Sequence, residues 1–144
     1  MPEPAIASPA TALPSDVLEF LRTPQRYAVI TTMDPDGRPR PVLVWYRLLG
    51  DTIVVNSKVG RRWPTNLIRD PRITLTVSDG HDWVSVEGTV EVVEDQAAAQ
   101  ADIAAMARAY ETPAEAVASI DAFERQRRIS FRVTPDRTHA DIGE

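Results

Sequence analysis

Five segments of β-type sequence follow one another closely between residues 26 and 94, and this spacing constrains the fold most. They are rich in β-branched and aromatic residues, and tight turns such as DPDG at residues 34–37 separate them. Because strands joined by tight turns pair antiparallel, the pattern predicts a mostly antiparallel sheet. Residues 127–133 form a sixth predicted strand, which ends at Pro135 before a polar tail. We therefore expect a mainly β fold with peripheral helices, built as a small six-stranded antiparallel barrel.

Local signals set the ends of the other elements. Ser15 can cap a short first helix that Pro24 ends. Asp95 and Thr112 stand at the N-cap positions of two later helices, which follow the fifth strand. Gly88 lies inside that strand and indicates a β-bulge or a close backbone approach.

Residues 1–14 are rich in proline and alanine without a period, which predicts a flexible arm ahead of a single domain at residues 15–144. The arm lacks the basic and apolar regions of a secretory signal. No apolar run approaches the roughly 20 residues of a membrane helix. There are no cysteines, which excludes disulfides and thiolate metal sites. We expect a cytoplasmic protein that does not bind membranes.

The net charge of −5 argues against nucleic-acid binding, which needs a broad basic surface. The two histidines, His81 and His139, have no metal-ligand spacing, and there is no GxSxG, Walker or GxGxxG motif. Hydrolysis by side chains and classical dinucleotide binding are therefore not expected. We predict no catalytic side chain and no metal ligand.

Residues 57–72 stand out from this acidic background. They carry one carboxylate, Asp70, against five cations, namely Lys58, Arg61, Arg62, Arg69 and Arg72. The segment follows a strand end and runs into a short predicted helix, whose first N–H groups favour anions. Arg61 and Arg62 precede this helix and Asn66 lies one turn later, so the three could clamp a phosphate. The alternative is a solvated basic helix that pairs with acidic residues such as Glu91.

Three tryptophans, Trp45, Trp63 and Trp83, lie on or beside the predicted strands, and Trp63 is inside the basic segment. Core packing explains any one of them better than ligand stacking does. Three tryptophans around a phosphate clamp nevertheless favour a flat, phosphate-bearing ligand.

The predicted strands and the basic segment, in their order along the chain, resemble those of the split β-barrel flavin- and deazaflavin-binding proteins, the pyridoxamine 5′-phosphate oxidase-like superfamily. The similarity is greatest to actinobacterial members that use the deazaflavin coenzyme F420. It covers residues 15–142, and its most specific part is the NL-x-x-DPR pattern at residues 66–72. The segments that carry it are AVITTMDPDGRPRPVLVWY, IVVNSKVGRRWPTNLIRDPRITLTV, WVSVEGTVEVVED and RRISFRVTPDR.

The resemblance implies roles for twelve residues. Those expected to line the isoalloxazine-like ring are Arg40, Pro41, Val42, Leu43 and Val44. Asn56 and Ser57 would contact the ring or the ribityl chain. Those expected to hold the phosphate are Arg61, Arg62 and Asn66, with Lys58 as a further cation. Trp83 would lie near a cofactor, that of the other subunit included, because the family is dimeric with cofactors at the interface. Where the family often has a basic pair ending in lysine, this chain has Arg62 followed by Trp63.

The implied function is that of a homodimeric oxidoreductase that uses F420 to transfer hydride to a small unsaturated or heteroaromatic substrate. The F420 tail carries a phosphodiester and an oligoglutamate, which Arg69 and Arg72 around the clamp would suit. One alternative is an FMN-dependent oxidase or reductase on the same fold. Another is a non-catalytic module that stores or senses the cofactor, or that binds haem.

Overall fold

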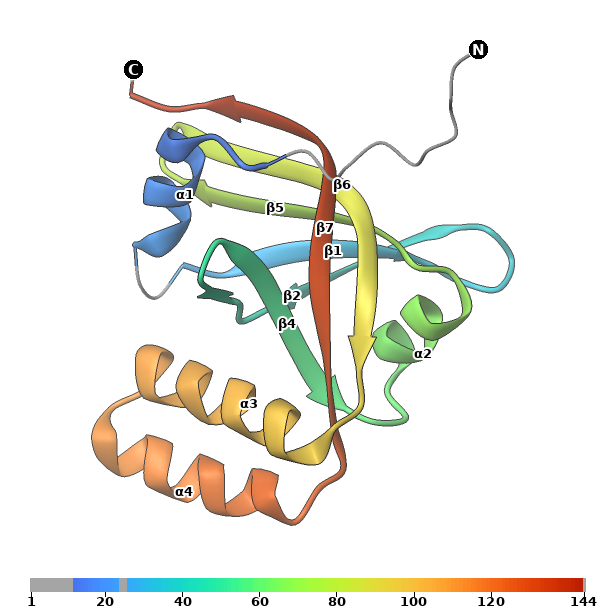
Figure 1. The fold of residues 1–144 in the computed structure, drawn as a ribbon, viewed down its shortest axis with the longest axis vertical. Helices are drawn as coiled ribbons and strands as arrows, with labels where there is room; N and C mark the ends of the chain where they lie inside the picture. Colours follow the sequence, from blue (N-terminus) through green and yellow to red (C-terminus); the bar gives the residue numbers. More distant parts are fainter. Residues whose placement is uncertain (1–11, 24–25, 144) are drawn as a thin grey trace.

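The computed structural model describes residues 12–23 and 26–143. Within these ranges the chain forms four helices and seven strands (Figure 1). In chain order these elements are α1 (Ser15–Arg22), β1 (Ala28–Met33), β2 (Pro39–Val44), β3 (Arg47–Leu49), β4 (Thr52–Lys58), α2 (Arg62–Arg69), β5 (Arg72–Asp79), β6 (Asp82–Val93), α3 (Gln96–Tyr110), α4 (Pro113–Glu124) and β7 (Arg128–Asp141).

The strands form one sheet in the order β2-β1-β5-β6-β7-β4-β3, and every neighbouring pair is antiparallel. The sheet curls like a barrel but is not closed, because β2 and β3 remain its two edges (Figure 1). The expected mainly β architecture with peripheral helices is therefore confirmed, although the number of strands is seven rather than six.

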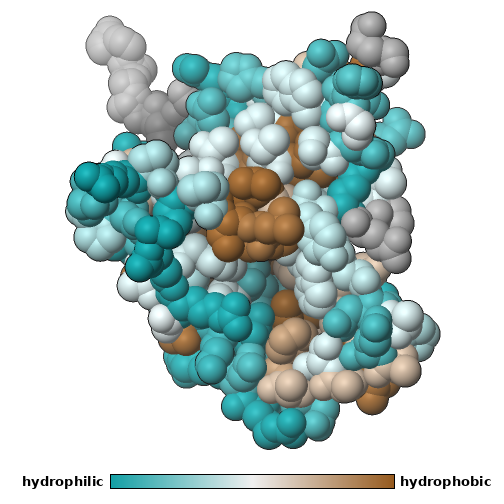
Figure 2. All heavy atoms as spheres, turned by 180° about the vertical axis from the view of Figure 1, so that it is seen from behind, coloured by the Kyte–Doolittle hydropathy of each residue, from teal (hydrophilic) through white to brown (hydrophobic). Residues whose placement is uncertain are grey.

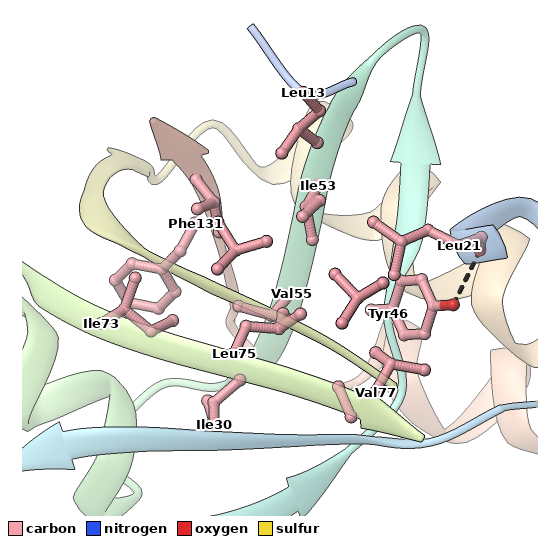
Figure 3. Close-up of a cluster of buried hydrophobic side chains, with 14 of the residues drawn as sticks. Leu13, Leu21, Ile30, Tyr46, Ile53, Val55, Ile73, Leu75, Val77 and Phe131 are labelled. Carbon is pink, nitrogen blue, oxygen red and sulfur yellow. Dashed lines mark hydrogen bonds between the residues drawn. The ribbon is translucent and has the colours of Figure 1, made fainter. Parts of the chain in front are cut away.

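The additional strand arises because the predicted second strand is divided. β2 pairs with β1, whereas β3 pairs with β4 at the other edge of the sheet. Between them Tyr46 is buried, and its hydroxyl donates a hydrogen bond of 2.7 Å to the carbonyl oxygen of Leu21 (Figure 3). The run from Pro39 to Leu49 is continuously strand-like in sequence, so it contains no signal for the point at which the chain changes neighbours.

The last strand is longer than predicted. β7 does not end at Pro135 but continues to Asp141 and pairs with β6, so the expected polar tail belongs to the sheet. Pro135 lies opposite Gly88, where the register of the ladder shifts. A Cβ atom at Gly88 would lie 2.1 Å from the carbonyl oxygen of Thr134. The bulge and close backbone approach predicted at Gly88 are thus confirmed, and the proline marks that irregularity.

Helix caps agree with the sequence at two of three predicted positions. The Asp95 side chain accepts a hydrogen bond from the Ala98 N–H, and Thr112 forms a capping box with Glu115. Ser15 is instead the first residue of α1, and no side chain caps that helix. The predicted stop at Pro24 lies outside the described residues.

The main hydrophobic core lies inside the curled sheet. Figure 3 shows side chains from several strands pointing toward one another, among them Ile30, Ile53, Leu75 and Phe131. Leu13 also belongs to this core and is 8% exposed, so the packed domain includes the last part of the predicted arm. Residues 1–11 of that arm lie outside the described residues.

A second, smaller core forms on the outer face of β4. Val54 packs there against Ile103 and Met106 of α3, and α4 lies against α3 (Figure 1). α3 therefore buries one face against the sheet, with Ile103, Met106 and Ala107 among its buried residues. None of the helices in the described ranges is long and apolar enough to cross a membrane.

Candidate functional site

A cavity of about 690 Å³ lies between β2, the end of β4, the segment before α2, the helix pair α3–α4 and the start of β7. Figure 2 shows a face with a hydrophobic patch at its centre and a hollow below it. Ten of the twelve predicted site residues line the cavity, namely Arg40, Pro41, Val42, Leu43, Val44, Asn56, Ser57, Lys58, Arg61 and Arg62. Segments distant in sequence thus converge on one space.

Asn66, one of the two other predicted residues, is 2% exposed and does not line the cavity. Its amide nitrogen donates to the Thr32 hydroxyl at 3.1 Å and to the Asp34 carboxylate at 2.9 Å. Both amide hydrogens are therefore used inside the protein.

Trp83 is the second predicted residue away from the cavity. It lies at the start of β6, where it pairs with Ser78 of β5 and Asp141 of β7, and it is 37% exposed. Within a single chain it does not take part in the site.

Asp34 organises the rim of the cavity, and the sequence interpretation missed it. Its carboxylate accepts a 2.8 Å hydrogen bond from Arg40 Nε and the bond from Asn66, and it lies 4.0 Å from Arg62. The hydrogen bond from Arg40, and then that from Asn66, hold the pKa of Asp34 below its usual range. Asn66 therefore orients the anion that positions Arg40.

Other cations at the cavity have no such partner. Lys58 and Arg61 both line it, and in the described part of the chain neither forms an ion pair. Arg61 is the N-cap of α2, and no side chain caps that helix. The free first-turn N–H groups and these cations give this end of the cavity a positive potential.

Arg69 and Arg72 do not surround the cavity, contrary to the expectation from sequence. Arg72 forms a 2.6 Å ion pair with Asp70, and its hydrogen bonds lower the pKa of Asp70 to about 2. Arg69 donates to the carbonyl oxygen of Met33 and to the side chain of Asn66. Arg72 thus stabilises the turn after α2, whereas Arg69 links α2 to the end of β1.

Two of the three tryptophans line the cavity. Trp45 stacks on Tyr110 with ring centroids 5.1 Å apart, and both pack against the smaller core, but only Trp45 of the two lines the cavity. Trp63 is 7% exposed and packs against Phe131 in the main core, at 5.7 Å between centroids. Trp63 is therefore mainly a core residue whose edge reaches the cavity.

Arg128, at the first position of β7, is a cavity residue that the sequence interpretation did not identify. It lies opposite Lys58 in the ladder and donates two hydrogen bonds to Asn56 Oδ1, at 3.0 and 2.9 Å. The Asn56 amide in turn donates to the carbonyl oxygen of Ala99 and to the hydroxyl of Ser130. The only sequence signal was an arginine pair directly before a buried strand.

This network continues away from the cavity. The Ser130 hydroxyl donates to the buried carboxylate of Asp102 at 2.7 Å, and Asp102 forms a 2.9 Å ion pair with Arg47. This hydrogen-bond network joins residues of β4, β7, α3 and β3, so several elements fix the position of Asn56. Within the described ranges, no three His, Asp or Glu side chains come together as a metal site.

The cavity thus combines an apolar wall with a cationic end, which suits a flat ligand that carries an anionic group. A family model described as pyridoxamine 5′-phosphate oxidase matches residues 13–140. The chain belongs to the pyridoxamine 5′-phosphate oxidase family. Most of the described domain is covered by this match, and no curated protein matches the chain.

Solved structures similar to this chain include proteins whose names describe different functions. The conserved hypothetical protein Rv2991 from Mycobacterium tuberculosis is 22% identical, covers 96% of each chain and has a TM-score of 0.75. An F420 reductase is also 22% identical, covers 88% of this chain and 98% of its own, and has a TM-score of 0.68. The heme storage protein HutZ from Vibrio cholerae is 16% identical, covers 89% and 93%, and has a TM-score of 0.67. At these identities the likeness establishes the fold alone.

Proposed function

We propose that this member of the pyridoxamine 5′-phosphate oxidase family is an oxidoreductase that binds coenzyme F420 in the cavity. Its substrate would be a small unsaturated or heteroaromatic molecule that accepts hydride. The observation that supports this most is the convergence of β2, the end of β4 and the basic segment before α2 on one cavity. The F420 reductase of the same fold adds support for this cofactor over others.

The coenzyme, when bound, supplies the hydride chemistry, and the protein supplies position, electrostatics and a dry environment. The β2 residues Val42, Leu43 and Val44 would line one side of the ring. Arg61 and Arg62 would hold the phosphate at the start of α2, where unsatisfied N–H groups also face outward. Asn66 acts from behind as a positioning residue through Asp34.

The proposed active form is a homodimer. Val29 and Leu43 are opposite each other across β1 and β2, and both are exposed, at 40% and 63%. Leu43 also lines the cavity, so this apolar face and the cavity adjoin. A second copy on this face would exclude water from the cavity and could bring its Trp83 near the cofactor.

FMN is the alternative cofactor, because its ring and phosphate would fit the same walls. Haem is favoured less: none of the residues that line the cavity is a histidine, the commonest protein ligand of haem iron. Trp45 and Trp63 border the cavity, so ligand binding is expected to change tryptophan fluorescence.

Titration of this fluorescence with F420, FMN and haem is the deciding experiment. We expect F420 to bind with a Kd below roughly 100 μM, about −5.5 kcal/mol. Binding of FMN or haem alone would replace the proposed cofactor, and no binding of any of them would refute the cofactor hypothesis. Turnover of an enone or quinone with the reduced cofactor then distinguishes an enzyme from a carrier.

Substitution of Arg62 tests the phosphate site. Arg62→Ala should weaken F420 binding by about 1.5 to 3 kcal/mol, because a charge-assisted hydrogen bond is lost, with little change in stability. Arg125→Ala is the matched control, since Arg125 is exposed at the C-cap of α4, does not line the cavity and pairs with Asp121. An affinity equal to that of the wild type would remove Arg62 from the site.

A further inference from the structure

Arg128 is a buried cation without a counter-ion. Its side chain lines the cavity, yet the residue is only 6% exposed. In the described part of the chain no carboxylate pairs with it, and its hydrogen-bond partners are the neutral amide oxygens of Asn56 and Gln126. A buried charge is costly unless an opposite charge compensates it.

Its hydrogen-bonding capacity is not exhausted by these contacts. A guanidinium has five N–H groups, and three of them serve Asn56 Oδ1 and Gln126 Oε1. One N–H on each terminal nitrogen remains, and in the described residues neither has a partner. Charged N–H donors of this kind form strong hydrogen bonds to a carboxylate or a phosphate.

The guanidinium is held firmly in this position. Asn56 is anchored by its own bonds to Ala99 and Ser130, and the Arg128 guanidinium lies 4.6 Å from the centre of the Phe123 ring. Such fixed donors bind an anion without first losing conformational freedom.

None of the residues that line the cavity is an aspartate or a glutamate. Burial, and then the nearby charge of Arg61, lower the pKa of the Arg128 guanidinium to about 10, so it remains charged at pH 7. Lys58 is its direct partner in the ladder and is also cationic. An anion at this place would be attracted by the positive charges of Lys58, Arg61 and Arg128.

We propose that Arg128 is an anion-binding residue of the cavity and that it takes an oxyanion, a phosphate or a carboxylate, of the bound ligand. This extends the proposed function by adding a residue from β7 to the predicted phosphate site at α2. Asn56 then serves as a positioning residue that directs the guanidinium toward the cavity, rather than as a direct ligand of the ring.

The first test compares ligands that share a ring and differ in charge. Affinities of FMN and riboflavin, and of F420 and its phosphate-free ribityl precursor, are measured for the wild type, Arg128→Gln and Arg128→Lys. We expect Arg128→Gln to weaken binding of the ligands that carry a phosphate roughly 10- to 100-fold and binding of the phosphate-free ligands little. Arg128→Lys keeps the positive charge with fewer N–H donors and should weaken binding less. Equal losses for ligands with and without the phosphate tail, or no loss, would overturn the proposal.

The second test requires no cofactor. Inorganic phosphate and free glutamate, each compared with chloride at constant ionic strength, should raise the Tm of the wild type more than that of Arg128→Gln. The anion with the larger effect identifies the group that Arg128 takes. Arg125→Gln is the matched control, because Arg125 is exposed, pairs with Asp121 and does not line the cavity, and it should respond like the wild type.

These results separate the two proposals. If F420 binds equally well to the wild type and to both Arg128 variants, the role of Arg128 is refuted and the proposed function stands. If no cofactor binds but phosphate or glutamate stabilises the protein through Arg128, the anion site stands and the proposed function fails. The anion site is refuted if Arg128→Gln changes neither the stabilisation by phosphate or glutamate nor the affinity for any ligand.

Discussion

Two aspartates pair with arginines in and near the cavity. Asp34 pairs with Arg40 at the rim, whereas Asp70 pairs with Arg72 in the turn after α2. The count of cations in residues 57–72 therefore overstates the charge available to a ligand. At the residue scale, the partner of each arginine decides its role, and the partner cannot be read from the sequence.

Asp70 gives a prediction for the dependence of stability on pH. Its pKa in the folded protein is about 2, below the ordinary 3.8, so folding favours the carboxylate. The stability that it contributes is present above pH 4 and is lost as the pH falls toward 2. Asp70→Asn should therefore lower the Tm at pH 7, and the difference from the wild type should disappear near pH 2.

Thermal unfolding at pH 7, 4 and 2 measures this effect. The control is Asp121→Asn, which removes an exposed ion pair with Arg125 and should change the Tm little. A difference at Asp70 that persists undiminished at pH 2 would show that its ion pair with Arg72 is not the cause.

At the scale of elements, the irregularity in the longest strand pair is the feature most dependent on one residue. Gly88 and Pro135 face each other where the β6–β7 register shifts, and Gly88 leaves no room for a side chain. The bulge lets the strand bend at this point, while β6 and β7 remain paired on both sides of it.

Gly88→Ala should consequently destabilise the fold by about 2 kcal/mol or more, because the new Cβ would collide with the backbone carbonyl of Thr134. Chemical denaturation measures the free energy of unfolding. Thr89→Ala on the same strand serves as the control and should cost less. Similar losses in both variants would mean that the close approach is relieved by movement of the backbone.

At the scale of the whole molecule, β1 and β2 expose an apolar face that includes Val29 and Leu43. It adjoins the cavity through Leu43, and Figure 2 shows a hydrophobic patch beside a hollow. A face of this kind favours association, since exposed apolar patches commonly mark interfaces.

If the proposed homodimer forms through this face, Val29→Glu should shift it to monomer, because the substitution places a charge there. Light scattering after size-exclusion chromatography measures the mass. Val117→Glu is the matched control, since Val117 is 71% exposed on α4 and away from β1 and β2. A dimer that survives Val29→Glu would exclude this face as the interface.

The sequence alone was sufficient for the features that depend on neighbours in the chain. Tight turns required antiparallel pairing, Asp95 and Thr112 capped their helices, and the basic segment at residues 57–72 marked one end of the cavity. These signals are local, because a cap or a turn is made by residues within about four positions of one another.

Only the tertiary structure decided which distant residues meet. It placed Arg128 against Asn56, 72 positions earlier, turned the Asn66 amide inward to Asp34, and kept Trp83 away from the cavity. It also divided the second predicted strand and paired the polar tail with β6. Such contacts depend on the register and curvature of the whole sheet, to which every strand contributes, and no short stretch of sequence contains that information.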